Sequence, residues 1–259
     1  MPITGPEILL YEKQDRIVTI TMNRPERLNA WSVELIERLE ETWERFRDDD
    51  DAWVAIVTGA GDKAFCAGFD LADQAERDKA GLGLPKRMPE PTPIEIWKPI
   101  IAAVNGYALG GGWALAQACD IRIAAEHAEF GIPETRWNMP AHYVYGLARR
   151  VHLGHALEIA LWGDRRLSAQ RGYEIGWINE VVPKEQLMDR AREWASRMLY
   201  LGPRAVRNLK EIIYRSLYMS PSEAEAFAKA LETNLWGMED TAEGPKAFQE
   251  GRKPQFKNR

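Results

Sequence analysis

The sequence predicts an α/β fold followed by an all-helical C-terminal segment. A strand-like apolar run, a loop of small residues and a helix-like run follow one another at residues 54–75, 100–118 and 121–162. From about residue 187 onward, apolar residues recur at helical spacing and no strand-like run separates them. Alternating strands and helices are typical of a largely parallel sheet covered by helices.

The N-terminal region predicts a hairpin and a capped helix. Residues 8–12 and 17–22 alternate in the manner of strands and flank a turn at Gln14 and Asp15. Ser32 then precedes a helix. We interpret the acidic run at 48–51 as the solvated end of that helix. The apolar face of the helix consists of Ile36, Leu39, Trp43 and Phe46.

Three consecutive glycines, at 110–112, separate a buried strand-like run (100–104) from a helix-like run (113–118). Glycines at a helix start remove side-chain bulk and leave unpaired N–H groups at the positive end of the helix dipole. Such a place suits a bound anion or an oxygen that becomes negative during a reaction. Alternatively, the glycines only allow close packing. The run matches neither a phosphate loop nor a dinucleotide-binding fingerprint.

A second strand, turn and small-residue loop (54–58, 59–62 and 65–71) has a similar form. Two such loops can each aim one N–H at a single oxygen, which is the geometry of an oxyanion hole. Glu134 follows a Gly-x-Pro turn in apolar surroundings, where a carboxyl pKa is raised and the group can carry protons. The alternative for Glu134 is a surface residue or an ion-pair partner.

Four segments (23–30, 64–71, 105–112 and 130–134) together resemble the crotonase, or enoyl-CoA hydratase/isomerase, superfamily in order and spacing. The resemblance covers about residues 8–256. It implies a spiral of repeated ββα units over 1–199 and a C-terminal helical domain over 200–259. Family members use the latter to pack trimers and to close part of the CoA site, so we expect a homotrimer or a dimer of trimers.

The resemblance also implies individual roles. The N–H groups of Phe69 and Gly111 would hold the thioester oxygen, and Glu134 would carry the proton. CoA would enter as part of the acyl-CoA substrate, so no separate cofactor is expected. The residues implied to border CoA are Arg27, Leu28, Ala67 (through its carbonyl, toward the adenine), Asp70, Leu71 and, from the tail, Lys253.

The chain departs from the hydratase pattern at Ala114, where hydratases carry the first of two glutamates. A single acid can shuttle a proton between carbons, as enoyl-CoA isomerases do, or protonate an α-carbon while another group handles water. Hydroxycinnamoyl-CoA hydratase-lyases also lack the first glutamate and have a tryptophan placed as Trp137 is here. Their C-terminal tyrosine has no counterpart, because Phe227 and Trp236 occupy that neighbourhood.

Two further pocket positions are His142 and Tyr143, where hydratases carry small glycines. They are either polar pocket groups or space-filling side chains, and we favour the second interpretation. The loss of the first glutamate also permits a catalytically inactive protein that binds CoA esters. The charged, proline-rich segment 76–93 predicts a mobile loop that borders the acyl pocket.

Composition and charge limit which other classes of function the protein can have. The 259 residues are 45% hydrophobic and 28% charged with a net charge of −5, which gives no electrostatic footprint for nucleic acid. No apolar run reaches transmembrane length. The four histidines form no metal-ligand pattern, and two of them, His152 and His155, lie on a helix predicted over 147–162. Cys66 and Cys119 predict buried free thiols in a reducing compartment, hence a cytoplasmic enzyme, with fatty acid metabolism as its expected context.

The C-terminal region predicts three amphipathic helices. Ser220 to Glu223 has the form of a capping box, with Pro221 at the first helical position. The three apolar faces are Leu187, Ala191, Trp194 and Met198; Val206, Leu209, Ile213 and Leu217; and Ala224, Phe227, Leu231 and Leu235.

Overall fold

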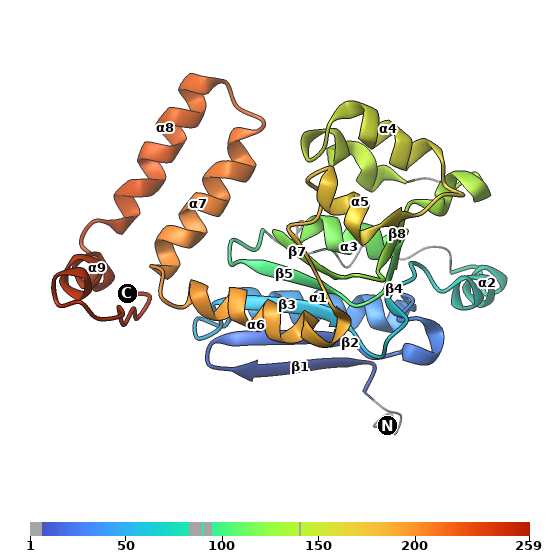
Figure 1. Ribbon diagram of the computed structural model, residues 1–259, viewed down its shortest axis with the longest axis horizontal. Helices are drawn as coiled ribbons and strands as arrows, with labels where there is room; N and C mark the ends of the chain where they lie inside the picture. Colours follow the sequence, from blue (N-terminus) through green and yellow to red (C-terminus); the bar gives the residue numbers. More distant parts are fainter. Residues whose placement is uncertain (1–6, 83–89, 91–94, 140) are drawn as a thin grey trace.

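A computed structural model describes residues 7–82, 90, 95–139 and 141–259. Two sheets form the body of the molecule (Figure 1). The larger sheet has the order β1 (Leu9–Gln14), β2 (Ile17–Met22), β3 (Val54–Gly59), β5 (Ile100–Val104), β7 (Ile121–Ala125) and β10 (Glu180–Val182). The smaller sheet has the order β4 (Ala64–Cys66), β6 (Tyr107–Leu109), β8 (Glu129–Gly131) and β9 (Leu167–Ser168).

The chain passes from one sheet to the other in each repeat. β3 leads into β4, β5 into β6 and β7 into β8, and each strand pairs in parallel with its equivalent in the next repeat. Helix α2 (Leu71–Lys79) follows β4, and α3 (Gly111–Ala118) follows β6. This arrangement is the predicted spiral of ββα units. The parallel strands of each repeat end at a common edge, where the loops that follow β4 and β6 meet.

The central strands β3 and β5 of the larger sheet are buried on both faces, which explains their continuous apolar runs. On one face, α1 (Val33–Asp48) and α3 cover the sheet, and the indoles of Trp113 and Trp177 stack with centroids 4.0 Å apart. On the other face, α6 (Leu187–Met198) packs against Ile56 and Ile101. Phe130 contacts both stacked indoles edge-on. Packing of the helices on both faces therefore holds the sheet in place, and with it the loops that follow β4 and β6.

The N-terminal hairpin and helix form largely as predicted. The turn lies at Asp15 and Arg16, with φ of 49° and 66°, one residue later than predicted, because Gln14 still pairs with Ile17. Ser32 caps α1 by accepting a hydrogen bond from the N–H of Leu35, and the four predicted apolar residues are buried. At the other end of α1, the buried Lys98 ammonium donates to two carbonyl oxygens, of Phe46 and Asp49, each at 2.6 Å.

Two predicted boundaries are wrong. The helix expected over 147–162 is broken: the 3₁₀ helix η4 (His142–Arg149) ends before α4 (Leu153–Leu161) begins. His152 has extended backbone (φ −57°, ψ 142°), and its Nδ1 accepts from the N–H of Gly154 as an N-cap. The loop expected from residue 76 starts later, because α2 continues to Lys79. The remainder of that prediction, at 83–89 and 91–93, lies outside the described residues.

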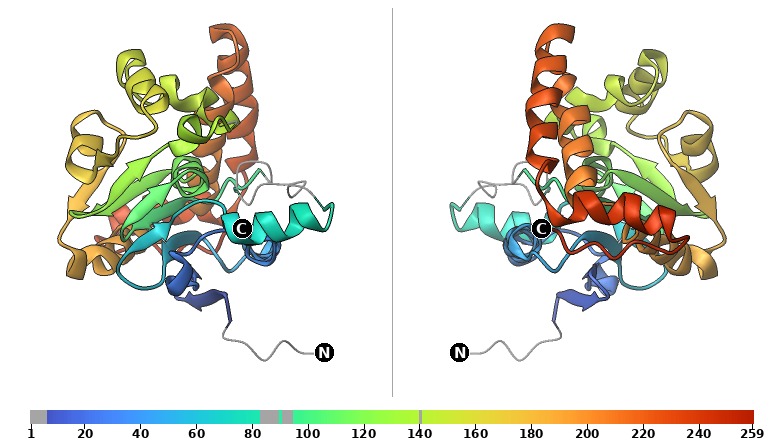
Figure 2. Two further views of the ribbon diagram at one scale, coloured as in Figure 1. Left: turned by 90° about the vertical axis from the view of Figure 1, so that its right-hand side faces the viewer. Right: turned by 90° about the vertical axis from the view of Figure 1, so that its left-hand side faces the viewer.

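The predicted apolar positions of the C-terminal region lie on helices as expected, except that Leu217 lies just past one helix and Leu235 lies on a short 3₁₀ helix. After α5 (Ala169–Glu174), the short η5 (Lys184–Gln186) and α6, the helices α7 (Pro203–Ser216) and α8 (Pro221–Glu232) form an antiparallel pair that stands away from the sheets (Figures 1 and 2). The capping box at Ser220 is present. After η6 (Thr233–Leu235), α9 (Glu239–Gln249) leads into the C-terminal tail. The division of the chain at 199/200 stays a prediction.

Partly buried polar contacts attach α7 to the sheets. The ammonium of Lys210 lies 2.7 Å from the carboxylate of Asp120, and the hydroxyl of Tyr214 donates to the same carboxylate at 3.0 Å. Asp120 in turn accepts from the N–H of Ile100 at the start of β5. Among the described residues, no helix combines the length and apolar character that crossing a bilayer requires.

Candidate active site

The loops that follow β4 and β6 touch through their glycines. A Cβ built on Gly68 would lie 3.0 Å from the carbonyl oxygen of Leu109 and 3.4 Å from the amide nitrogen of Gly111. A Cβ on Gly112 would lie only 2.0 Å from the carbonyl oxygen of Cys66. The glycines therefore do allow close packing, as the simpler interpretation held. This packing also places the first amides of α3 beside the loop at 67–70.

Two backbone N–H groups remain available at this contact. Phe69 forms a parallel β-bridge with Trp31. The N–H of Trp31 donates to the carbonyl of Gly68 at 2.8 Å, and the N–H of Asp70 donates to the carbonyl of Trp31 at 3.0 Å. That pattern leaves the N–H of Phe69 unused. Gly111 is the first residue of α3, where N–H groups have no intrahelical acceptor. Within the described part of the chain, neither N–H has a hydrogen-bond acceptor.

Glu134 lies on the 3₁₀ helix η3 (Pro133–Trp137), directly beside the glycine run. A Cβ built on Gly110 would lie 3.0 Å from its Oε1. The hydroxyl of Tyr143 donates to the same oxygen at 2.5 Å. Oε2 is buried and, among the described residues, has no hydrogen-bond partner. Burial raises the pKa of Glu134, and the hydrogen bond from Tyr143 opposes this rise. Glu134 is thus only partly exposed, and it forms no ion pair with the described residues.

The residues expected to border CoA fall into two groups. The N–H of Ala67 donates to the carbonyl of Leu28 at 3.1 Å, so these two segments lie together, and Arg27 is exposed on η1 (Pro25–Arg27) next to them. The carboxylate of Asp70 caps α2 and pairs with Arg24 at 3.0 Å, whereas Leu71 beside it is largely exposed.

Lys253 is not brought to this site within one chain. Its ammonium lies 4.1 Å from the ring centroid of Tyr200, just after α6. In Figure 1, α9 and the C-terminus lie on the opposite side of the molecule from α2. The nucleotide-binding role expected for Lys253 therefore has no support in the single chain.

The predicted pocket residues separate into buried and exposed ones. Ala114 is buried on α3, whereas Trp137 is exposed on η3 with the guanidinium of Arg136 5.5 Å from its ring centroid. His142 is exposed, but Tyr143 is buried and bonded to Glu134. The space-filling interpretation is therefore wrong for Tyr143. No sequence signal revealed this pairing, because it depends on how η4 folds back over η3.

Two buried asparagines that sequence reasoning overlooked fix the loops. The amide of Asn29 donates to the carbonyls of Ala60 and Ala64, and the amide of Asn105 donates to those of Gly59 and Gly61. Asn29 lies inside the motif 23–30, and Asn105 lies inside the motif 105–112. Their presence in these motifs was the available signal for a role in fixing the loop backbone.

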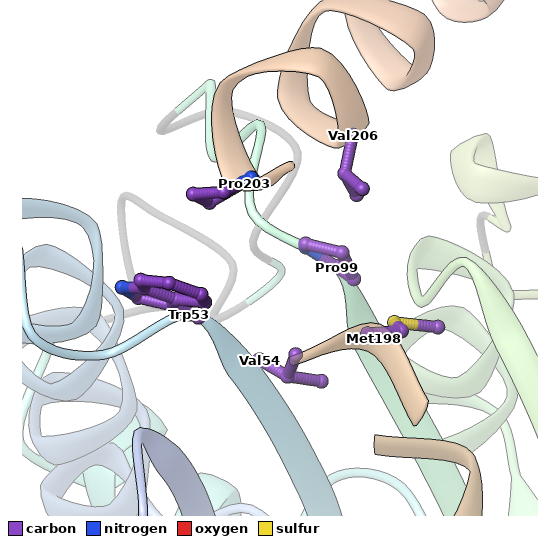
Figure 3. Close-up of a pocket in the computed structure, with 6 residues that line it drawn as sticks. All are labelled: Trp53, Val54, Pro99, Met198, Pro203 and Val206. Atoms are coloured by element: carbon purple, nitrogen blue, oxygen red, sulfur yellow. The ribbon is translucent and has the colours of Figure 1, made fainter. Parts of the chain in front are cut away.

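A small apolar cavity lies elsewhere (Figure 3). Its volume of about 10 Å³ is at the lower limit for one water molecule. It lies at the amino ends of β3 and β5, the opposite edge of the sheet from the glycine loops. We interpret it as a packing gap below α7. It is lined by Trp53, Val54, Pro99, Met198, Pro203 and Val206.

Comparison with known proteins identifies the family. The family model described as enoyl-CoA hydratase/isomerase matches residues 12–259. This chain belongs to the enoyl-CoA hydratase/isomerase family. It is 34% identical to the (E)-benzylidenesuccinyl-CoA hydratase of Thauera aromatica, over 99% of each chain. It is 35% identical to the enoyl-CoA hydratase EchA19 of Mycobacterium tuberculosis, over 99% of this chain and 98% of that relative.

Solved structures give the same assignment. The crystal structure of an enoyl-CoA hydratase/isomerase from Mycobacterium paratuberculosis superposes with a TM-score of 0.90 and 34% identity, covering 98% of this chain and all of that one. The fold is thus the crotonase fold, as the sequence predicted. This member of the enoyl-CoA hydratase/isomerase family is an acyl-CoA enzyme of the hydratase/isomerase type.

Proposed function

We propose that this enoyl-CoA hydratase/isomerase family member stabilises a thioester enolate with the N–H groups of Phe69 and Gly111 and moves a single proton with Glu134. The observation that carries the proposal is that two N–H donors without acceptors among the described residues and the half-buried carboxylate of Glu134 all border the same glycine run. A thioester enolate carries its charge on oxygen. Two preorganised donors aimed at that oxygen lower the barrier for losing or gaining the α-proton.

The proposed reaction needs only one proton carrier. The Glu134 carboxylate takes the α-proton, and the C–H electron pair moves into the enolate. In isomerisation, the protonated Glu134 carboxyl, whose proton can first exchange with water, then delivers a proton to the γ-carbon of the enolate. In dehydration, the proton goes to the departing hydroxyl, so that water leaves and a double bond forms. Ala114 supplies no second carboxylate, and CoA takes part only as the carrier of the acyl group, with no further cofactor.

We also propose that the enzyme works as a homotrimer or a dimer of trimers. Three leucines on α4 and three apolar residues on α7 are between 47% and 63% exposed in the single chain, and a second copy would bury them. Light scattering that shows a monomer would contradict this assembly. The exposed residues are Leu153, Leu157 and Leu161 on α4, and Leu209, Ile213 and Leu217 on α7.

A cytoplasmic site of action agrees with two free, buried thiols, Cys66 and Cys119, whose pKa burial raises to about 12. Trp137 favours a second candidate, a hydratase-lyase of the hydroxycinnamoyl-CoA type, but no tyrosine stands at Phe227 or Trp236 to complete that pattern. Release of an aldehyde from a hydroxycinnamoyl-CoA ester would favour this second candidate.

The proposal is tested with 2-enoyl-, 3-enoyl- and 3-hydroxyacyl-CoA esters in deuterated water. We expect deuterium at the α-carbon of at least one class, and its loss in Glu134→Gln. The matched control is Glu126→Gln, because Glu126 is exposed eight residues earlier. Exchange that persists in Glu134→Gln would assign the proton to another group. If esters bind and none is either exchanged or converted to another ester, the protein is an inactive binder.

A further inference from the structure

The contact between Tyr143 and Glu134 is one-sided. The phenol hydroxyl holds Oε1 at 2.5 Å, whereas Oε2 is buried without a partner among the described residues. A buried carboxylate oxygen without a donor is costly, and such a cost is typical of atoms that a ligand or reactant will meet. The two oxygens of this carboxylate are therefore not equivalent.

Tyr143 is itself held firmly. Its ring is 8% exposed. Its backbone carbonyl accepts from the side-chain amide of Gln117 at 2.7 Å, and the oxygen of that amide accepts from the indole N–H of Trp113 at 3.1 Å. These bonds fasten η4 to α3, the helix that supplies Gly111. One rigid helix thus positions both a proposed oxyanion donor and the hydroxyl that orients the acid.

We propose that Tyr143 is a positioning residue that holds Oε1 of Glu134 and leaves Oε2 as the atom that takes and returns the substrate proton. This inference rests on the proposed function of Glu134. A hydroxyl that donates to a carboxylate stabilises the charged form, so Tyr143 also counteracts the rise in pKa that burial imposes on Glu134. Burial and the neighbouring Glu134 charge raise the pKa of Tyr143 itself, which keeps the phenol protonated as a donor.

Two other titratable groups face this pair. Glu90 has a pKa raised by burial, and its charge contributes to the raised pKa of Tyr143. His142 precedes Tyr143 and acts on Glu90 with the opposite sign. Because titration of Glu90 would add its own inflection to a pH profile, the Glu90→Gln variant is measured in parallel as a control. The acidic limb of the pH profile, which is assigned to Glu134, must still be present in Glu90→Gln.

The test is Tyr143→Phe, which removes only the hydroxyl. Tyr145→Phe is the matched control, because Tyr145 lies on the same 3₁₀ helix with 74% of its side chain exposed. The readouts are kcat and KM against pH, on the ester class that exchanges its α-hydrogen fastest in deuterated water. Thermal midpoints check that each variant is folded.

We expect Tyr143→Phe to lower kcat by about ten- to a hundredfold with little change in KM, because a hydrogen bond to a charged group is lost. The acidic limb of the kcat–pH profile of Tyr143→Phe should move to higher pH by about one unit, since the Glu134 carboxylate loses its stabilising donor. Tyr145→Phe should match the wild type. In the double variant Tyr143→Phe/Glu134→Gln, activity should be no lower than in Glu134→Gln.

Each contrary result has a distinct meaning. An inactive Glu134→Gln together with an unshifted acidic limb and normal kcat in Tyr143→Phe would overturn the positioning role alone. A rate that falls without any shift of the limb would also overturn it, because loss of packing would explain that result. An active Glu134→Gln would overturn both the proposed function and this inference.

Discussion

The carboxylate of Glu134 lies against the backbone of Gly110, where a side chain would displace it. Gly110 has φ 54° and ψ −116°, and a Cβ there would lie 3.0 Å from Oε1 of Glu134. The absence of a side chain at Gly110 therefore both permits the backbone conformation before α3 and leaves room for the acid.

We predict that Gly110→Ala lowers kcat by about a hundredfold, since displacing a catalytic group by about 1 Å can cost that much. It should also destabilise the fold by about 1–3 kcal/mol through backbone strain. Gly237→Ala is the control, because Gly237 also has positive φ (90°) but nothing lies within 4 Å of its Cβ position. Equal loss of activity in both variants would show that strain, not displacement of Glu134, is responsible.

Glu134→Gln should stabilise the protein slightly while it removes activity. A carboxyl whose pKa is raised by folding binds its proton more tightly in the folded state. Its contribution to stability therefore falls as pH rises from the ordinary value, 4.5, through the raised pKa, and the penalty is complete above that. Gln carries no charge at any pH.

Thermal melts from pH 4 to pH 8 check this prediction. The melting temperature of Glu134→Gln should exceed that of the wild type by a few degrees at pH 8, since about 1 kcal/mol corresponds to roughly 2–4 °C in a chain of this size. The difference should shrink toward acidic pH. A variant that melts lower at pH 8 would show that the hydrogen bond from Tyr143 stabilises the carboxylate by more than burial penalises it.

The role of Phe69 depends on its backbone, so its side chain must be kept. Replacing Phe69 by 3-phenyllactic acid changes the amide N–H to an ester oxygen and leaves the ring in place. We predict a loss of about 10²–10³ in kcat if this N–H holds the enolate oxygen. The same replacement at Phe248, which is 88% exposed, controls for the ester itself. An unchanged rate would remove Phe69 from the oxyanion hole.

Ala114 tests the single-acid interpretation. Hydration of crotonyl-CoA by the wild type should be slow, because no second carboxylate orients the attacking water, a contribution of several kcal/mol in a well-built site. Ala114→Glu should raise the hydration rate, and Ala114→Gln, of similar size without charge, should not. Because Ala114 is buried, both variants should melt lower than the wild type. Fast hydration by the unaltered protein would contradict the single-acid interpretation.

Local signals in the sequence were sufficient for much of the fold. The apolar spacing along α1, the capping residues Ser32 and Ser220, and the glycine run at the start of α3 all act within a few residues, and the structure confirms them. The errors are local as well. Nothing at His152 marks the break between η4 and α4, since its extended backbone is stabilised by a cap formed with Gly154.

The sequence by itself determined the family and the two candidate loops, because these depend on the order of motifs along the chain. It also singled out Glu134 as the candidate proton carrier, a role that stays a proposal, and burial raises the pKa of this residue. It did not determine what surrounds that acid. Only the tertiary structure brings the Tyr143 hydroxyl to Oε1 of Glu134, leaves Oε2 without a partner among the described residues, and places Asp70 in a helix cap and an ion pair. The physical reason is that burial and hydrogen bonding set a side chain's chemistry, and both depend on segments that the chain brings together only when it folds.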